Sequence, residues 1–263
     1  MKRVIVTGAT GFIGSHVVKQ LESDGHKVYC LSRERDIREP FALPDLYECV
    51  IHCAGNARMY WSVEHPAEDF KLNALGTLNT LNATIQAKIP RFVYLSTSAI
   101  DEQMPYTPYV LSKLAAETYV AYYRRVHELE TCILHPTKVF GIGMKKNVIY
   151  DLIRAHLKRK PLKMGYKPAS RFNFCYIGDL VVTISALATL KELPWSELTC
   201  SSFSVSVHEL EKHIGELTNS DVTLTYPQDA PIWSLIPNPP DGGSEDELRE
   251  CLRLTIEWMR EQQ

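Results

Sequence analysis

The sequence predicts an α/β protein with a doubly wound, mostly parallel sheet and a smaller C-terminal lobe. Three observations lead to this prediction. Apolar strand patterns alternate with amphipathic helix patterns, a glycine-rich turn follows the first strand, and 45% of the 263 residues are hydrophobic, enough for a full core. Strands are expected at 3–7, 27–31, 49–53, 91–96, 131–135 and 198–203, and helices at 12–24, 67–87, 109–128, 147–159, 178–190, 206–218 and 245–261.

The glycine-rich turn joins the first strand to the first helix. Gly8, Gly11 and Gly14 follow the apolar run 4–6 at the spacing of a dinucleotide-binding loop. Gly8 permits the tight turn, Gly11 lets backbone approach a pyrophosphate, and Gly14 lets the helix pack closely on its strand. Because the first N–H groups of that helix would face the phosphates, the pattern predicts a Rossmann-type dinucleotide site.

The residues after the second strand indicate which dinucleotide is bound. An NAD enzyme of this fold typically has Asp or Glu here, where the carboxylate binds the ribose hydroxyls. In this chain Ser32 stands at that position, and Arg33 and Arg35 follow. A guanidinium can bind a 2′-phosphate through two hydrogen bonds, whereas a carboxylate would repel it, so NADP(H) is favoured over NAD(H). The alternative is that Arg33 is a solvated loop charge.

The segment between the second and third strands is short. Residues 33–48 leave little room for the additional strand and helix that a doubly wound fold usually has there. We interpret residues 36–38 as the remnant of that strand.

A tyrosine and a lysine begin the helix expected at 109–128. Tyr109 and Lys113 are four residues apart and share one helix face. A nearby ammonium favours phenolate, so Lys113 is expected to lower the pKa of Tyr109 and make it a proton donor or acceptor near neutral pH. The preceding strand ends in hydroxyl residues that include Thr97 and Ser98. A hydroxyl at that carboxyl end can hydrogen-bond a substrate carbonyl beside the tyrosine.

Composition and charge exclude other classes of protein. The net charge is −2, so no basic field for nucleic acid is expected, and no apolar run is long enough to span a membrane. The seven cysteines are scattered without a C-x-x-C pair, and we expect buried free thiols and no metal site. The chain enters a strand at once, so no signal peptide and a cytoplasmic location are expected.

The second half of the chain is expected to divide between the sheet and the lobe. Capping boxes at Ser206–Glu209 and Ser244–Glu247 mark two helix starts, and the proline-rich residues 227–243 are expected to be loop. The expected dinucleotide-binding domain comprises residues 1–140 and 174–204, and the expected substrate-binding lobe comprises residues 141–173 and 205–263.

These motifs together resemble the extended short-chain dehydrogenase/reductases, the NAD-dependent epimerase/dehydratase family. The resemblance covers nearly the whole chain. Its most specific segments are residues 7–14, 52–55 and 109–113, and residues 73–79, 92–97, 136–141, 176–180 and 248–258 support it.

The resemblance implies a role for individual residues. Tyr109 would be the general acid/base, Lys113 would hold the nicotinamide ribose, and Thr97 would be the catalytic hydroxyl. Ser98 is the second choice for the catalytic hydroxyl and is expected to bind the substrate. Hydride would pass to or from nicotinamide C4. The residues implied to bind the cofactor are Gly8, Thr10, Gly11, Phe12, Ile13, Gly14, Ser32, Arg33, Arg35, Asp36, Ile37, Cys53, Ala54, Gly55, Asn73, Tyr109, Lys113, Pro136 and Val139.

Two residues of the lobe are implied to contact the substrate. Asn147 begins a helix after a glycine-rich turn, where the family often uses Asn to contact the nucleotide diphosphate. Arg171 sits one residue earlier than the arginine of the family pattern, so alternation along a strand would turn it to the other face. Its alternative role is a surface charge.

The resemblance also narrows the reaction. The 4,6-dehydratases of the family have an Asp-Glu pair after the hydroxyl strand, where this chain has Ser98 and Ala99. Residues 101–102 come later and are interpreted as solvated loop charges. The C4 epimerases need only the tyrosine, the hydroxyl and tightly held NAD, whereas a preference for NADP(H) favours net reduction.

We therefore expect NADP(H)-dependent reduction of a keto group of a nucleotide-linked (deoxy)sugar. Three alternatives stay open: a nucleotide-sugar 4-epimerase, a reductase of a small carbonyl compound, and a non-catalytic NADP(H)-binding sensor. Sensors on this scaffold commonly lack the Tyr–Lys pair, which disfavours the last.

The resemblance implies a homodimer. Relatives often pair through the helix with the tyrosine and the helix before it. Residues 67–87 and 109–126 have the apolar faces that this requires, although the same faces can be covered within a monomer. No nucleic acid or membrane partner is expected.

Overall fold

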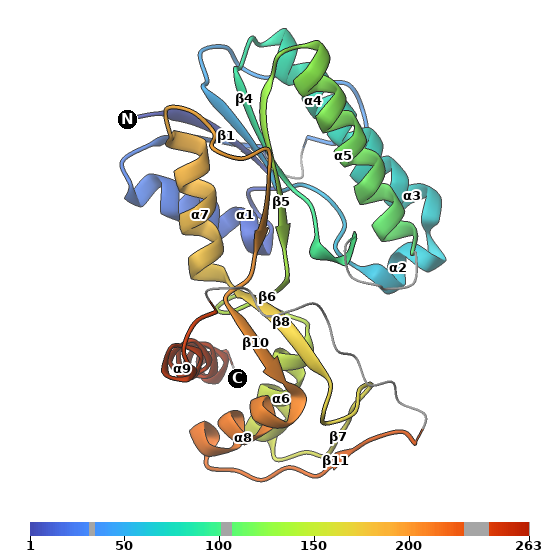
Figure 1. Cartoon of the computed structure of the whole chain (residues 1–263), viewed down its shortest axis with the longest axis vertical. Coiled ribbons are helices and arrows are strands. Elements are labelled where there is room, and N and C mark those ends of the chain that lie inside the picture. The colour runs from blue at the N-terminus through green and yellow to red at the C-terminus, as the bar shows by residue number, and fades with distance from the viewer. Residues whose placement is uncertain (32–34, 101–106, 229–241, 263) are drawn as a thin grey trace. The chain divides into compact units, whose positions relative to one another are not determined.

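In the residues that the structure describes, six parallel strands form the central sheet, as predicted. The computed structural model (Figure 1) describes residues 1–31, 35–100, 107–228 and 242–262. The strand order is β2-β1-β3-β4-β5-β9, and every neighbouring pair runs parallel. The strands are β1 (Arg3–Thr7), β2 (Lys27–Leu31), β3 (Cys49–His52), β4 (Arg91–Leu95), β5 (Glu130–Pro136) and β9 (Glu197–Cys200).

The chain divides into two compact units. The first comprises Met1–Pro136 and Leu180–Cys200, and the second comprises Thr137–Asp179 and Ser201–Gln263. The α/β class and the parallel sheet are confirmed. The binding roles assigned to the two predicted domains stay predictions.

Helices cover both faces of the sheet in the first unit. Figure 1 shows α4 and α5 side by side on one face, with α1 and α7 on the other. The Ser185 hydroxyl of α7 donates to the Asp24 carboxylate at the end of α1, at 2.7 Å. The helices are α1 (Phe12–Ser23), α2 (Met59–Glu64), α3 (Pro66–Phe70), α4 (Gly76–Gln86), α5 (Pro108–Val126) and α7 (Ile177–Thr189), with a 3₁₀ turn η2 (Ser98–Ile100).

The single helix predicted at 67–87 is interrupted. It consists of α3, a π-helical turn η1 (Lys71–Leu75) and α4. The buried Asn73 lies in this π-helical turn, and its side chain donates hydrogen bonds to Asp69 and Ser112.

The strand remnant predicted at 36–38 is wrong. The Asp36 carboxylate accepts from the Arg38 backbone N–H at 3.0 Å and from its guanidinium at 2.7 Å, which forms a turn instead. Strand β2 is consequently the edge of the sheet. Cys30 on this strand is exposed, contrary to the prediction of buried cysteines. Cys53 and Cys251 are half-buried, and all seven cysteines are free thiols.

The second unit has an aromatic core. Its sheet has the order β10-β8-β6, and Phe140, Phe174 and Phe203 meet edge to face across it. The predicted strand 198–203 is split, since β9 ends opposite Pro136 in the large sheet whereas Phe203 pairs with Phe174. The elements are β6 (Lys138–Phe140), α6 (Val148–Lys158), β7 (Leu162–Lys163), β8 (Arg171–Tyr176), β10 (Phe203–Ser206), α8 (Val207–Thr218), β11 (Leu224–Thr225) and α9 (Glu245–Glu261).

Both predicted capping boxes are confirmed. Ser206 and Ser244 accept from the backbone of Glu209 and Glu247, whose carboxylates bind back to the capping residues. In the described ranges, none of the helices is long and apolar enough to cross a membrane.

Candidate active site

The glycine turn packs backbone against backbone. Gly8 has a φ of +64°, and a Cβ on it would lie 2.7 Å from the Ala54 nitrogen. A Cβ on Gly14 would lie 2.2 Å from the Gly8 carbonyl oxygen, which accepts from the Gly11 N–H at 2.8 Å. Gly11 precedes α1 and offers no side-chain cap, so the first N–H groups of this helix stay available to an anion.

The other predicted residues of this turn lie beside it. Thr10 is exposed, and Phe12 and Ile13 are half-buried in the first turn of α1. Cys53 is half-buried after β3, where burial raises the pKa of its thiol to about 12.

The segment predicted to contact the adenosine ribose lies only partly within the described residues. Arg35 is exposed, and Asp36 is engaged by Arg38. Ile37 is buried, and its carbonyl accepts from the Asn79 amide at 2.9 Å. Ser32 and Arg33 lie outside the described residues.

A buried histidine joins the ends of β1 and β3 to α4. The Thr77 hydroxyl donates to the Asn73 carbonyl at 2.6 Å, so it accepts from His52 Nε2 at 3.1 Å. His52 Nδ1 then accepts from the Thr7 hydroxyl at 2.8 Å, and that hydroxyl accepts from the Ala54 N–H at 3.2 Å. Burial lowers the pKa of His52 to about 3, so the imidazole is neutral. His52 is not among the residues predicted to form the site.

The Tyr109 phenol and the Thr97 hydroxyl interact. Tyr109 lies at the start of α5 and is 8% exposed. Burial raises its pKa to about 12, and the Thr97 hydroxyl acts in the opposite direction. Thr97 follows β4, and its oxygen also accepts from the Ala99 N–H at 3.2 Å. The neighbouring Ser98 is buried in η2.

Lys113 is buried one turn further along α5. Its ammonium donates to the carbonyl of Leu95, the last residue of β4, at 2.9 Å and lies 5.0 Å from the Tyr94 ring centroid. Burial lowers the pKa of Lys113 to about 8. The predicted lowering of the pKa of Tyr109 by Lys113 is wrong for this structure, because burial of the phenol has the larger effect and Lys113 binds Leu95 instead.

A buried carboxylate lies behind this pair. Asp69 accepts from the Ser112 hydroxyl at 2.6 Å and from the Asn73 amide at 3.2 Å. Asn73 also donates to Ser112 at 3.0 Å and accepts from the Asn56 N–H at 2.8 Å. A Cβ on Gly55 would lie 2.8 Å from the Asn73 carbonyl oxygen and 3.4 Å from Lys113 Nζ, so this backbone passes close to both side chains.

Sequence reasoning missed Asp69 and Ser112. Two signals could have identified them. Asp69 stands four residues before Asn73, on the same helix face, and Ser112 immediately precedes Lys113.

The predicted substrate contacts of the second unit have partners within that unit. Asn147 caps α6, because its oxygen accepts from the Tyr150 N–H at 2.8 Å and its amide donates to the Val139 carbonyl at 2.9 Å. Pro136 and Val139 were both predicted to bind the cofactor. Pro136 ends β5 in the first unit, whereas Val139 lies on β6 in the second.

Arg171 is held by an ion pair. Its guanidinium binds both oxygens of the Glu209 carboxylate, at 3.0 and 2.9 Å, and donates to the Ser204 carbonyl at 2.8 Å. The substrate roles of Asn147 and Arg171 stay predictions.

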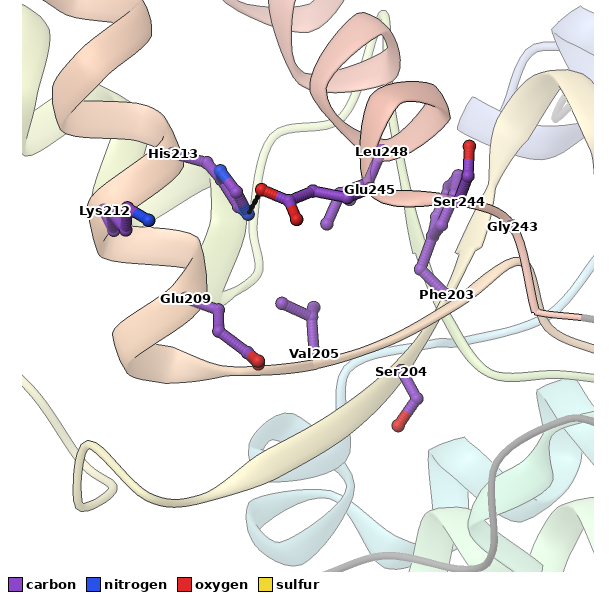
Figure 2. Close-up of a pocket in the computed structure, with 10 residues that line it drawn as sticks. All are labelled: Phe203, Ser204, Val205, Glu209, Lys212, His213, Gly243, Ser244, Glu245 and Leu248. Carbon is purple, nitrogen blue, oxygen red and sulfur yellow. Dashed lines mark ion pairs between the residues drawn. The ribbon is translucent and has the colours of Figure 1, made fainter.

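A separate cavity of about 310 Å³ lies in the second unit, among β10, α8 and the start of α9. Figure 2 shows the His213 ring turned toward Glu245, with 3.6 Å between its Nε2 and the carboxylate. None of the residues predicted to bind cofactor or substrate is among those that line this cavity in the described structure. The candidate active site is therefore the group formed by Tyr109, Thr97 and Lys113 at the carboxyl end of β4.

Comparisons with known proteins show the family of the chain. Residues 4–194 match the model of the NAD dependent epimerase/dehydratase family. The chain is 27% identical to a putative UDP-glucose 4-epimerase of Methanocaldococcus jannaschii, over 98% of each chain. It is 28% identical to GDP-6-deoxy-D-mannose reductase of Pseudomonas aeruginosa, over 85% of this chain and 82% of that one.

Solved structures share the fold along the whole chain. MoeE5 in complex with UDP-glucuronic acid and NAD is 26% identical, with a TM-score of 0.86 over 99% of this chain and 100% of the other. The UDP-glucose 4-epimerase of Thermus thermophilus, in complex with NAD, has a TM-score of 0.81 at 24% identity, over 98% of this chain and 99% of that one.

Proposed function

The chain belongs to the NAD dependent epimerase/dehydratase family of extended short-chain dehydrogenase/reductase enzymes, and we propose that it reduces a keto group of a nucleotide-linked (deoxy)sugar with NADP(H). The observation that carries the proposal is the pair of neighbouring hydroxyls, Tyr109 and Thr97, beyond the carboxyl end of β4, with Lys113 on the same helix face as Tyr109.

The glycine turn fits a dinucleotide pyrophosphate. Any side chain at Gly8 or Gly14 would collide with backbone, and the N-terminus of α1 has no side-chain cap. Backbone N–H groups there can bind the phosphates. When bound, the nicotinamide supplies the hydride, and the residues of this chain supply position and a proton.

Tyr109 acts as the acid in the proposed reduction. Burial raises its pKa to about 12, so the phenol holds its proton at neutral pH and can donate it to the carbonyl oxygen of the substrate. The Thr97 hydroxyl can bind the same oxygen. Lys113 holds the ribose in the proposal, at the end of β4 where its ammonium already binds backbone.

The named relatives support a nucleotide sugar as the substrate. One relative along most of the chain is a GDP-6-deoxy-D-mannose reductase, which supports reduction. The putative UDP-glucose 4-epimerase that matches 98% of the chain supports 4-epimerisation as the second candidate.

The cofactor preference rests on Ser32, Arg33 and Arg35. The solved relatives named above bind NAD, so this preference is a separate proposal from the reaction. It is tested by kcat/KM for NADPH and NADH in the wild type and in Arg33→Ala. NADPH should be preferred, and Arg33→Ala should lose that preference. A wild type that prefers NADH would contradict it.

A homodimer through α4 and α5 is part of the proposal. Apolar side chains on α5 are exposed at helical spacing, among them Leu111, Leu114, Tyr122 and Val126. Light scattering should give twice the chain mass, and Leu114→Glu should give one chain mass. The seven free thiols support a reducing, cytoplasmic location.

The reaction is tested with nucleotide-linked 4-keto-6-deoxysugars and UDP-glucose. Reduction should consume NADPH in equal amount to the product formed, measured by absorbance and mass spectrometry. Epimerisation would convert UDP-glucose without net loss of reduced cofactor and would favour the second candidate. Cofactor binding without turnover of any nucleotide sugar or small carbonyl compound would contradict both.

A further inference from the structure

Asp69 has a buried carboxylate near the candidate active site, and the sequence did not predict a role for it. Asp69 lies on α3 and is 0% exposed. It accepts hydrogen bonds from Ser112 on α5, from Asn73 on η1 and from Asn56 after β3, the last at 2.6 Å. Three parts of the chain, at residues 56, 69–73 and 112, therefore meet at one side chain.

A carboxylate in this position costs free energy. Burying a charge is unfavourable unless hydrogen bonds or an opposite charge compensate. No ion pair of Asp69 with a cation occurs in the described part of the chain, so its three neutral donors provide the compensation. One of these donors, Ser112, immediately precedes Lys113, so this buried charge lies next to the candidate active site.

The contacts of Asp69 fix the orientation of two neighbours. The Asn73 amide must point its nitrogen toward Asp69 and Ser112, which leaves its oxygen toward the Asn56 N–H. The Ser112 hydroxyl ties α5 to the same carboxylate, one residue before Lys113 and 2.9 Å from the Tyr109 carbonyl oxygen.

We infer that Asp69 is a positioning residue of the proposed reaction. Its carboxylate holds the Asn73 amide and the segment of α5 that presents Tyr109 and Lys113. The charge of the carboxylate acts on Tyr109 and on Lys113. This inference rests on the proposed function, but the effects of Asp69 on Asn73 and Lys113 can be measured without turnover.

The charge of Asp69 reaches the reactive side chains. Burial is the main influence on Lys113, whose pKa it lowers, and Cys53, Glu117 and Asp69 act in the opposite direction. Asp69 also raises the pKa of Tyr109, after the larger effect of burial. Neutralising Asp69 should therefore lower the pKa of Lys113.

The test is an NMR titration of ¹³C-labelled lysine in the full chain. The Lys113 signal is identified by its absence in Lys113→Met. In Asp69→Asn the midpoint of Lys113 should fall by about half a pH unit or more. Glu64→Gln, which removes an exposed carboxylate five residues earlier, should leave it unchanged. Equal midpoints in Asp69→Asn and the wild type would overturn the inference.

A second variant covers the case in which Asp69→Asn does not fold. Asp69→Glu keeps the charge but displaces the carboxylate. The side-chain amide signals of Asn73, identified with Asn73→Asp, should shift, and kcat should fall about tenfold with KM within about twofold. Unshifted Asn73 signals would overturn the inference. If the wild type shows no turnover, the proposed function fails, whereas the NMR signals still decide the role of Asp69.

Discussion

The two units of the protein differ in where they keep their charged side chains. Among the described residues, the buried Asp, Glu, Lys and Arg side chains are Asp69, Arg91 and Lys113, and all three belong to the first unit. The ion pairs of the second unit are partly exposed and include Arg171–Glu209, Arg249–Glu216 and Arg253–Glu250. Because buried charge is costly and exposed pairs contribute little, the buried charges of the first unit depend most on their compensating contacts.

Burial of charge alone does not identify a site. Arg91 is as buried as Lys113, but it begins β4, at the amino end of the sheet. It donates to the carbonyls of Leu187 and Leu190 at the end of α7 and pairs with Glu130. Those contacts stabilise a helix C-terminus. Lys113 reaches the carboxyl end of the same strand, where open α/β sheets bind ligands.

The largest effect that tests this comparison is expected from Tyr109→Phe. Removing the phenol hydroxyl removes the proposed proton donor, so kcat should fall about 10²- to 10⁴-fold while the Kd of NADPH changes by less than about threefold. Steady-state kinetics and cofactor fluorescence measure the two. Tyr119→Phe, at an exposed position of α5, is the control and should keep wild-type kcat. Undiminished turnover in Tyr109→Phe would show that the assigned acid is wrong.

The next effect is expected from Gly14→Ala. The added methyl group would lie 2.2 Å from the Gly8 carbonyl oxygen, so the turn must shift. We expect a loss of about 2–3 kcal/mol in the free energy of unfolding, with weaker cofactor binding. Gly165→Ala in the second unit meets no atom within 4 Å and should change stability by less than about 0.5 kcal/mol. Urea unfolding measures both, and equal losses would contradict the close packing of this turn.

A third prediction concerns the dependence of stability on pH. His52 has an ordinary pKa of 6.5, which burial lowers to about 3 in the folded protein. The unfolded chain therefore binds the extra proton between these values, and His52 makes the protein less stable as the pH falls below 6.5, by about 1.4 kcal/mol per pH unit. Above that ordinary pKa this contribution does not change with pH.

The measurement compares urea unfolding from about pH 7 to about pH 4 in His52→Gln and the wild type. The variant is less stable at neutral pH because it loses hydrogen bonds, but its stability should fall less steeply with acid. His208→Gln, at an exposed position of the second unit, should keep the wild-type slope. Identical slopes in His52→Gln and the wild type would mean that the imidazole is not held neutral.

The sequence predicted features formed by residues close together along the chain better than features formed by distant residues. The glycine turn and the capping boxes lie within short segments, so spacing alone identified them. Asp69 and Ser112 are 43 residues apart and their contact depends on packing. The pKa of Tyr109 was predicted in the wrong direction for the same reason, since sequence spacing places Lys113 nearby but does not give the burial of the phenol.

The smallest effect is expected from Arg171→Ala in the second unit. The side chains of Arg171 and Glu209 are 41% and 44% exposed, so solvent screens their ion pair. The free energy of unfolding should change by less than about 1 kcal/mol, and Glu209→Gln should change it by a similar amount. A loss above about 2 kcal/mol would contradict the view that exposed charges contribute little in this unit. KM for the nucleotide sugar is the independent measurement. A rise in Arg171→Ala without a loss of stability would support the substrate contact predicted from the sequence, because the guanidinium would then bind the ligand in addition to Glu209.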